Sequence, residues 1–127
     1  MRPSPWDPSD TTINKSPLGL WMVIRDKFPV TLGHIIIVSA LGKKNLGDLS
    51  DEEVVELHWL IRYLRNDLRA RYGCDGFTIG VNDGEAAGQT VDVLHVHVIP
   101  RYYGDTPRPE GGIRAVIPGK QTYEEKD

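Results

Sequence analysis

The run LHVHVIP at positions 94–100 constrains the fold of this chain more than any other feature. In a β-strand, successive side chains point to opposite faces of the sheet. The apolar residues of this run therefore share one face, and His95 and His97 share the other. We predict that Leu94, Val96 and Val98 are buried under a helix, while both imidazoles line a cleft on the opposite face. A shift of the strand by one residue would exchange the two faces.

Other apolar, partly β-branched runs bounded by turn residues predict further strands. These strands are expected at Thr11–Ile13, Leu18–Arg25, His34–Val38 and Phe77–Val81. Proline cannot donate a ladder hydrogen bond, so Pro100 is predicted to mark the end of the histidine strand.

One long helix is predicted between Ser50 and Gly73. Ser50 with Glu53 three residues later is a capping-box signature, and a glycine is typical of the position just beyond a helix. Apolar residues recur between them at steps of three and four, at Val54, Leu57, Ile61, Leu64 and Leu68. Of these, Leu57, Ile61 and Leu64 are expected to be buried against the sheet. Three strands, a helix and two strands predict an α+β domain, with an antiparallel sheet of about five strands and one long helix on one face.

The length of 127 residues predicts a single domain spanning residues 1–127. We expect residues 1–10 to be loosely ordered and residues 104–127 to form a C-terminal tail. A formal net charge of −3 argues against general binding to nucleic acid or to a membrane surface. The lone Cys74 excludes an internal disulfide and is typical of a cytoplasmic protein. No apolar run approaches the roughly 18–20 residues of a membrane span.

A polar, glycine-rich loop at residues 80–90 leads into the histidine strand. Glycines let a main chain approach phosphate oxygens closely. A neutral imidazole is an uncharged nucleophile, and its Nε2 can attack when Nδ1 holds the proton against a main-chain carbonyl. Loop and strand together are therefore the candidate active site.

The segment Gly84–Val91, followed by Leu94–Arg101, resembles the signature of the histidine triad (HIT) family. Further matches are Asp26–Thr31, Gly33–His34, Gly104–Asp105 and Gly111–Arg114. The resemblance runs from about Trp6 to Tyr123, and is greatest to bacterial HIT proteins related to dinucleoside polyphosphate hydrolases. It implies a HIT-like fold, a homodimer and a nucleotide-type small-molecule substrate, with no cofactor and no metal.

The resemblance also implies catalytic roles. His95 matches the nucleophile, which attacks the α-phosphorus of a nucleotide and expels the leaving group. Water then releases nucleoside monophosphate from the covalent phosphoramidate. His97 matches a residue that contacts the phosphate. Gln89 matches a residue that contacts the phosphates and the leaving-group oxygen.

Five positions match the substrate-binding residues of the family. Asp26 matches the acid that hydrogen-bonds the ribose hydroxyls, and His34 belongs to the histidine cluster. The remaining positions lie along the loop, with Asn82 on the pocket rim and with Gly88 and Thr90 beside the phosphates.

The chain departs from the family pattern at Val93, where the first of three alternating histidines is expected. Lys43 and Lys44 also stand in a segment that differs from the family, where they are either a solvated charge pair or a contact to distal phosphates. Three hypotheses stay open: a nucleotidyl hydrolase or transferase, a nucleotide-binding module that Val93 has deprived of turnover, and a metal site made by His34, His95 and His97. The sequence leaves the nucleobase, the leaving group and the pathway open.

Overall fold

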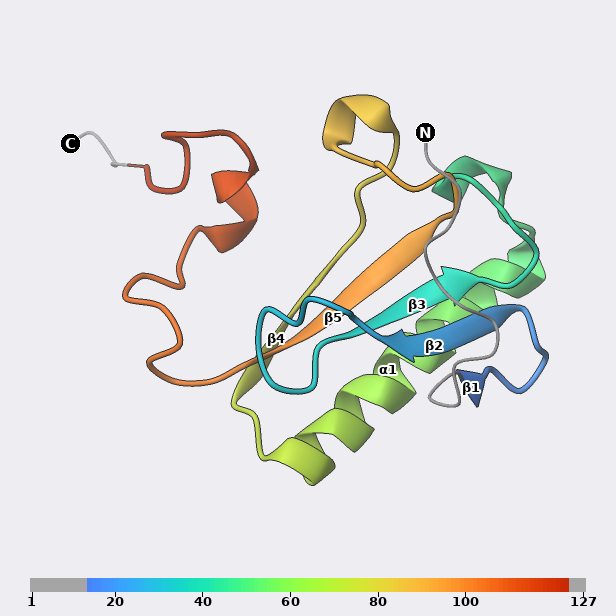
Figure 1. Ribbon diagram of the computed structural model, residues 1–127, viewed down its shortest axis with the longest axis horizontal. Helices are drawn as coiled ribbons and strands as arrows, with labels where there is room; N and C mark the ends of the chain where they lie inside the picture. The colour runs from blue at the N-terminus through green and yellow to red at the C-terminus, as the bar shows by residue number, and fades with distance from the viewer. Residues whose placement is uncertain (1–13, 124–127) are drawn as a thin grey trace.

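The computed structural model describes residues 14–123, which form one antiparallel sheet covered on one face by a long helix (Figure 1). The strands lie in the order β1-β2-β3-β5-β4. Their bounds are Asn14–Lys15 for β1, Trp21–Arg25 for β2, Ile35–Ser39 for β3, Gly76–Gly80 for β4 and His95–Arg101 for β5. The helix α1 spans Asp51–Tyr72, and short 3-10 helices lie at Leu46–Asp48 (η1), Glu85–Ala87 (η2) and Gly112–Val116 (η3). The predicted α+β architecture is confirmed.

The second strand begins later than predicted, because the residues before it form a turn around a buried carboxylate. Glu56 of α1 accepts hydrogen bonds from the Ser16 hydroxyl and from the main-chain N–H groups of Leu18 and Leu20. These donors are therefore used in the turn, and ladder pairing starts at Trp21. The strand predicted at Thr11–Ile13 lies outside the described residues.

Pro100 does not end the histidine strand, which continues to Arg101. The Arg101 carbonyl accepts from Asp75 on the β4 side, whereas the Pro100 carbonyl accepts from the Thr31 hydroxyl on the β3 side. N–H and C=O of one strand residue point the same way. The donor that proline lacks would therefore face the side on which the pairing with β3 has stopped at Val98, so the pairing with β4 is unaffected.

The predicted caps of the helix are both present. The Ser50 hydroxyl accepts from the Glu53 N–H, and the Glu53 carboxylate accepts from the Ser50 N–H. Gly73 closes the other end in the left-handed conformation, with φ of 65°. No helix within residues 14–123 is long and apolar enough to cross a membrane.

The core lies between α1 and the helix-facing side of the sheet. Leu94, Val96 and Val98 are at most 1% exposed and pack with the helix residues, so the predicted strand polarity is confirmed. Leu57 is buried as expected, while Ile61 and Leu64 are half-buried at the edge of the same cluster.

The predicted apolar stripe of the helix is wrong at its first residue, Val54, which is 49% exposed. Glu53 and Glu56 occupy the buried face of the first turns instead. The carbonyl of Glu53 accepts from the Trp21 indole, and the carboxylate of Glu56 holds the turn before β2. Polar groups that bind main-chain donors therefore take the inward positions here, which a pattern of apolar residues alone does not reveal.

Candidate active site

His95 and His97 project from the face of β5 opposite the helix, and both are half-buried. The Nδ1 atom of His95 lies 3.0 Å from the main-chain oxygen of Val93. A carbonyl oxygen only accepts, so the proton of the neutral ring sits on Nδ1. The lone pair is then on Nε2, which is the tautomer required for attack on phosphorus.

A main-chain N–H also fixes the proton positions of the other two histidines. Val30 donates to Nδ1 of His34 over 3.0 Å, so a neutral His34 carries its proton on Nε2. That Nε2 lies 2.9 Å from Nδ1 of His97, which must then accept. The proton of a neutral His97 is therefore on its Nε2.

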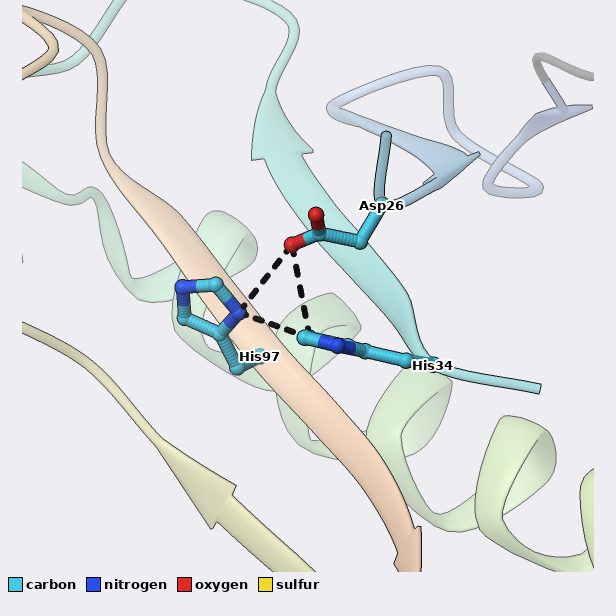
Figure 2. Close-up of side chains that lie close together, drawn as sticks. All are labelled: Asp26, His34 and His97. Atoms are coloured by element: carbon cyan, nitrogen blue, oxygen red, sulfur yellow. Dashed lines mark hydrogen bonds and ion pairs between the residues drawn. The ribbon is translucent and has the colours of Figure 1, made fainter. Parts of the chain in front are cut away.

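Asp26 completes this cluster from the end of β2, as Figure 2 shows. Its Oδ2 lies 3.4 Å from His34 Nε2 and 3.7 Å from His97 Nδ1. Its Oδ1 accepts from the Phe28 N–H, which fixes the carboxylate in a tight turn. Three residues far apart in the sequence are thus joined at the junction of β2, β3 and β5.

The cluster favours neutral imidazoles. Burial lowers the pKa of His34 below 6.5, against the attraction of the Asp26 carboxylate. Burial also lowers the pKa of His97, and its two histidine neighbours lower it further, while Asp26 again opposes the shift. Apolar side chains line the same face next to the histidines, namely Met22, Ile24, Ile36, Val38 and Val93. At neutral pH both rings therefore act as neutral donors and acceptors.

Asp26, His34 and His97 are also close enough together to hold a metal ion. The metal site expected from the sequence groups His95 with His34 and His97, but the fold places Asp26 beside these two histidines instead. A histidine that binds a metal usually donates its second N–H to an acceptor. His34 does the opposite, since its second nitrogen accepts from Val30. Binding a metal through Nε2 would remove the last proton from that ring, which disfavours the metal hypothesis.

Gln89 lies in the loop before β5 and is 3% exposed. Its side-chain oxygen accepts from the Gly84 N–H, and its NH₂ group donates to the carbonyls of Lys44 and Val91. The contact with phosphates expected of this residue stays a prediction. What the structure shows is an amide group bound to the main chain of two loops.

The other predicted binding residues line the same loop and are exposed. Asn82 lies two residues beyond Gly80, which pairs with His97 across the sheet. Gly88 has φ of +92° beside the Asn82 side chain, and Thr90 follows Gln89 five residues before β5 begins. The loop therefore connects the end of β4, which pairs with His97, to the start of the histidine strand.

The two lysines of the 43–44 segment have separate partners. The Lys43 ammonium lies 3.0 Å from Glu53 Oε1 and donates to the Asp48 carbonyl, so it is part of the helix N-terminus. Lys44 lies 3.4 Å from the Asp92 carboxylate and is largely exposed. Lys43 therefore has neither of the two expected roles, since it is neither half of a solvated charge pair nor placed to contact a phosphate, but binds the start of the helix.

Comparison with known proteins decides the family. The model of the HIT domain matches residues 14–104, which include the whole sheet and the histidine cluster. The chain belongs to the HIT family. The match contains the candidate catalytic strand and the loop that precedes it.

Individual HIT proteins agree with this assignment. A bis(5′-nucleosyl)-tetraphosphatase of Schizosaccharomyces pombe is 29% identical over 77% of this chain and 58% of its own length. A bis(5′-adenosyl)-triphosphatase of Dictyostelium discoideum is 33% identical over 58% of this chain and 49% of its own length. The chain thus spans about half the length of these relatives. A solved structure of Plasmodium falciparum diadenosine triphosphate hydrolase, in complex with cyclomarin A, superposes with a TM-score of 0.72 at 26% identity. It covers 82% of this chain and 70% of the other.

Sequence reasoning missed the groups that hold the site together. Val30 acts through its main-chain N–H, which leaves no signature in the choice of side chain. The sequence identifies Glu53 only as a capping residue, although its carboxylate also binds Lys43. An acid at the third helical position together with a lysine ten residues earlier could have indicated this pair, but many exposed pairs have similar spacings.

Proposed function

We propose that this HIT protein is a nucleotide hydrolase or nucleotidyltransferase that acts at the α-phosphate through a covalent nucleotidyl-histidine. The observation that carries the proposal is the hydrogen bond between His95 Nδ1 and the Val93 carbonyl. It fixes the tautomer in which Nε2 carries the nucleophilic lone pair. The relatives that cleave dinucleoside polyphosphates support the same substrate class.

The proposed reaction has two steps. Nε2 of His95 forms a bond to the α-phosphorus while the bond to the leaving-group oxygen breaks. Water then attacks the phosphorus, the P–N bond breaks, and nucleoside monophosphate leaves with the neutral imidazole restored. His97, with a proton on Nε2, is suited to donate a hydrogen bond to a phosphate oxygen on which charge develops. Asp26 is proposed to contact the ribose, and Asn82, Gly88 and Thr90 to border the phosphates.

A nucleotide-binding module without turnover is the second candidate, since Val93 replaces an imidazole with an apolar side chain. The bond that orients His95 argues against it, because its acceptor is the main-chain carbonyl of Val93. A valine keeps that carbonyl. We therefore propose that the substitution tunes the choice of leaving group and leaves the nucleophile intact.

His95→Ala should abolish turnover, because a covalent step disappears, and the loss should exceed the roughly 10–100-fold that a supporting contact gives. The protein is incubated with dinucleoside tri- and tetraphosphates, nucleotide sugars and nucleoside phosphoramidates, and released nucleoside monophosphate is measured. Acid-quenched samples are examined by mass spectrometry for a nucleotidyl group on His95.

His58→Ala is the matched control, since this histidine is exposed on α1. Turnover that survives His95→Ala would refute the nucleophile. Nucleotide binding by the wild-type protein without release of monophosphate would favour the binding module.

We also propose that the protein is a two-fold dimer. The edge strand β4 pairs only with β5 within the described chain, and symmetric dimers are the commonest soluble assemblies. Light scattering that gives the mass of a single chain would exclude this assembly.

A further inference from the structure

The side chain of Gln89 is fully occupied by main-chain partners. Its oxygen accepts from the Gly84 N–H over 2.8 Å, and its nitrogen donates to the carbonyls of Lys44 and Val91 over 2.9 and 3.1 Å. A primary amide has two N–H donors and one oxygen, so both ends of this group are engaged. A direct bond to a phosphate would have to break one of these buried bonds.

The same residue closes the loop through its main chain. The Gln89 N–H donates to the Gly84 carbonyl over 3.1 Å, while the Gly84 N–H donates to the Gln89 side chain. Gly84 and Gly88 both have positive φ, at 98° and 92°, which is the conformation such a tight turn requires. Residues 84–89 therefore form a ring that the main chain and the side chain of Gln89 close together.

The other partner of Gln89 belongs to a firmly anchored segment. Next to Lys44, the Lys43 N–H donates to the Ser39 hydroxyl, and the Lys43 carbonyl accepts from Leu94. The Lys43 ammonium binds Glu53, which is 1% exposed in the first turn of α1. The bond from Gln89 to Lys44 thus ties the glycine-rich loop to the helix and to the start of the histidine strand.

We propose that Gln89 is a positioning residue, which serves the reaction by holding the 84–91 loop in the shape in which it borders the phosphates. This inference deepens the proposed function and rests on it. Main-chain N–H groups of a glycine-rich loop bind phosphate oxygens only when the loop is already shaped for them. In this account the amide of Gln89 acts through the loop and does not touch the substrate.

The first test measures the loop without any ligand. Amide hydrogen exchange at Gly84 should become at least about 10-fold faster in Gln89→Ala, because its acceptor is lost and the ring opens. Gly84→Ala opens the same loop by backbone strain while Gln89 stays in place. Gly76→Ala is the matched glycine control, since an added Cβ there meets no atom within 4 Å and φ is not positive. It should exchange like the wild type.

The second test measures the consequence for phosphate. Binding of adenosine 5′-monophosphate should weaken about 10-fold or more in both Gln89→Ala and Gly84→Ala, while binding of adenosine should stay within about 2-fold of the wild type. The double variant should lose no more than either single variant, because both break the same ring. A loss of stability alone would weaken both ligands equally.

Each other outcome overturns a defined part of this account. Unchanged exchange at Gly84 with reduced turnover in Gln89→Ala would show a direct contact with substrate. Phosphate binding that survives in Gly84→Ala would overturn the role of the loop. A wild-type protein that binds no nucleotide and releases no monophosphate would overturn the proposed function, and the phosphate role of Gln89 with it.

Discussion

At the residue scale, one main-chain donor determines the protonation pattern of the whole histidine cluster. Because Val30 donates to Nδ1 of His34, the protons of His34 and His97 both lie on Nε2. His95 has the opposite tautomer, fixed by the carbonyl of Val93. Two neighbouring histidines of one strand therefore present different atoms to a substrate, an acceptor lone pair from His95 and an N–H donor from His97. Such a division suits one residue for attack and the other for charge stabilisation.

We expect the free energy of unfolding to fall as the pH is lowered from 7.5 to 5.5. His34 and His97 have folded pKa values below 6.5, the ordinary value that the unfolded chain regains. Between the folded pKa and 6.5 the unfolded chain binds more protons, so stability is present above this window and is lost as the pH falls through it. Urea unfolding at several pH values measures the slope. His34→Gln should flatten it, whereas His58→Gln at the exposed helix position should not.

Val93→His should raise turnover of dinucleoside polyphosphates and keep the fold. The main-chain carbonyl that orients His95 is unchanged, and the new imidazole would add a polar group to the cleft face. The valine packs against an apolar cluster that includes Ile24 and Ile36, so stability should fall slightly. Steady-state kinetics measure the effect. Unchanged relative turnover of dinucleoside polyphosphates, nucleotide sugars and phosphoramidates in the variant would contradict the proposed role of Val93 in the choice of leaving group.

At the element scale, the first turn of α1 links the core to the catalytic loops. Burial opposes the charge of Glu53, but hydrogen bonds from Ser50 and Lys43 outweigh it and lower the pKa of Glu53. Glu53 caps the helix and also binds Lys43, whose neighbour Lys44 accepts a hydrogen bond from Gln89. A change in the cap should therefore affect the loop as well as the helix.

Ser50→Ala should destabilise the protein by about 1 kcal/mol, the usual effect of losing a side-chain cap. The Ser50 hydroxyl accepts from the Glu53 N–H, and the variant leaves that donor to water. Ser50→Asp is the matched variant that keeps an acceptor and should stay near wild-type stability. Urea denaturation distinguishes them. Equal stability of all three proteins would show that the cap is unimportant here.

The sequence predicted the elements better than the connections between them. The alternation of apolar residues and histidines placed Leu94 and His95 on the correct faces. Side chains of a strand alternate between two faces, so once the apolar residues face the core, the histidines must face away from it. The helix caps also followed from local chemistry at Ser50 and Gly73. The Asp26 cluster, the bonds of Gln89 and the inward turn of Glu56 could not be predicted, since each depends on a partner that only the folded chain brings near.

At the scale of the whole molecule, the loop between β2 and β3 is supported from two distant elements. Gly33 approaches the Tyr72 ring at the end of α1 and the Pro100 ring of β5, and its φ is +91°. Nearby, the Tyr102 hydroxyl donates to the Leu32 carbonyl. The positions of Asp26 and His34 at either end of this loop thus depend on contacts made by the C-terminal half of the chain.

Gly33→Ala should destabilise the protein by about 2 kcal/mol, because a side chain at positive φ is strained and the added Cβ would lie 2.9 Å from the Tyr72 ring. Thermal unfolding measures this loss. Gly42→Ala, at φ of +74° with nothing within 4 Å of the Cβ, isolates the contribution of strain. A Gly33 variant no less stable than the Gly42 variant would show that the contact with Tyr72 is unimportant.

The proline in β5 has a consequence for how copies of the chain behave at high concentration. Within residues 14–123, the pairing of β5 with β3 stops at Val98, which faces Ile35 at the start of β3, and an unpaired main-chain donor beyond it would be able to pair with a strand from another molecule. Pro100 has no N–H to offer, and its carbonyl is already taken by the Thr31 hydroxyl. Pro100 therefore offers no unpaired main-chain group to a strand of another molecule, while its own side chain stays buried.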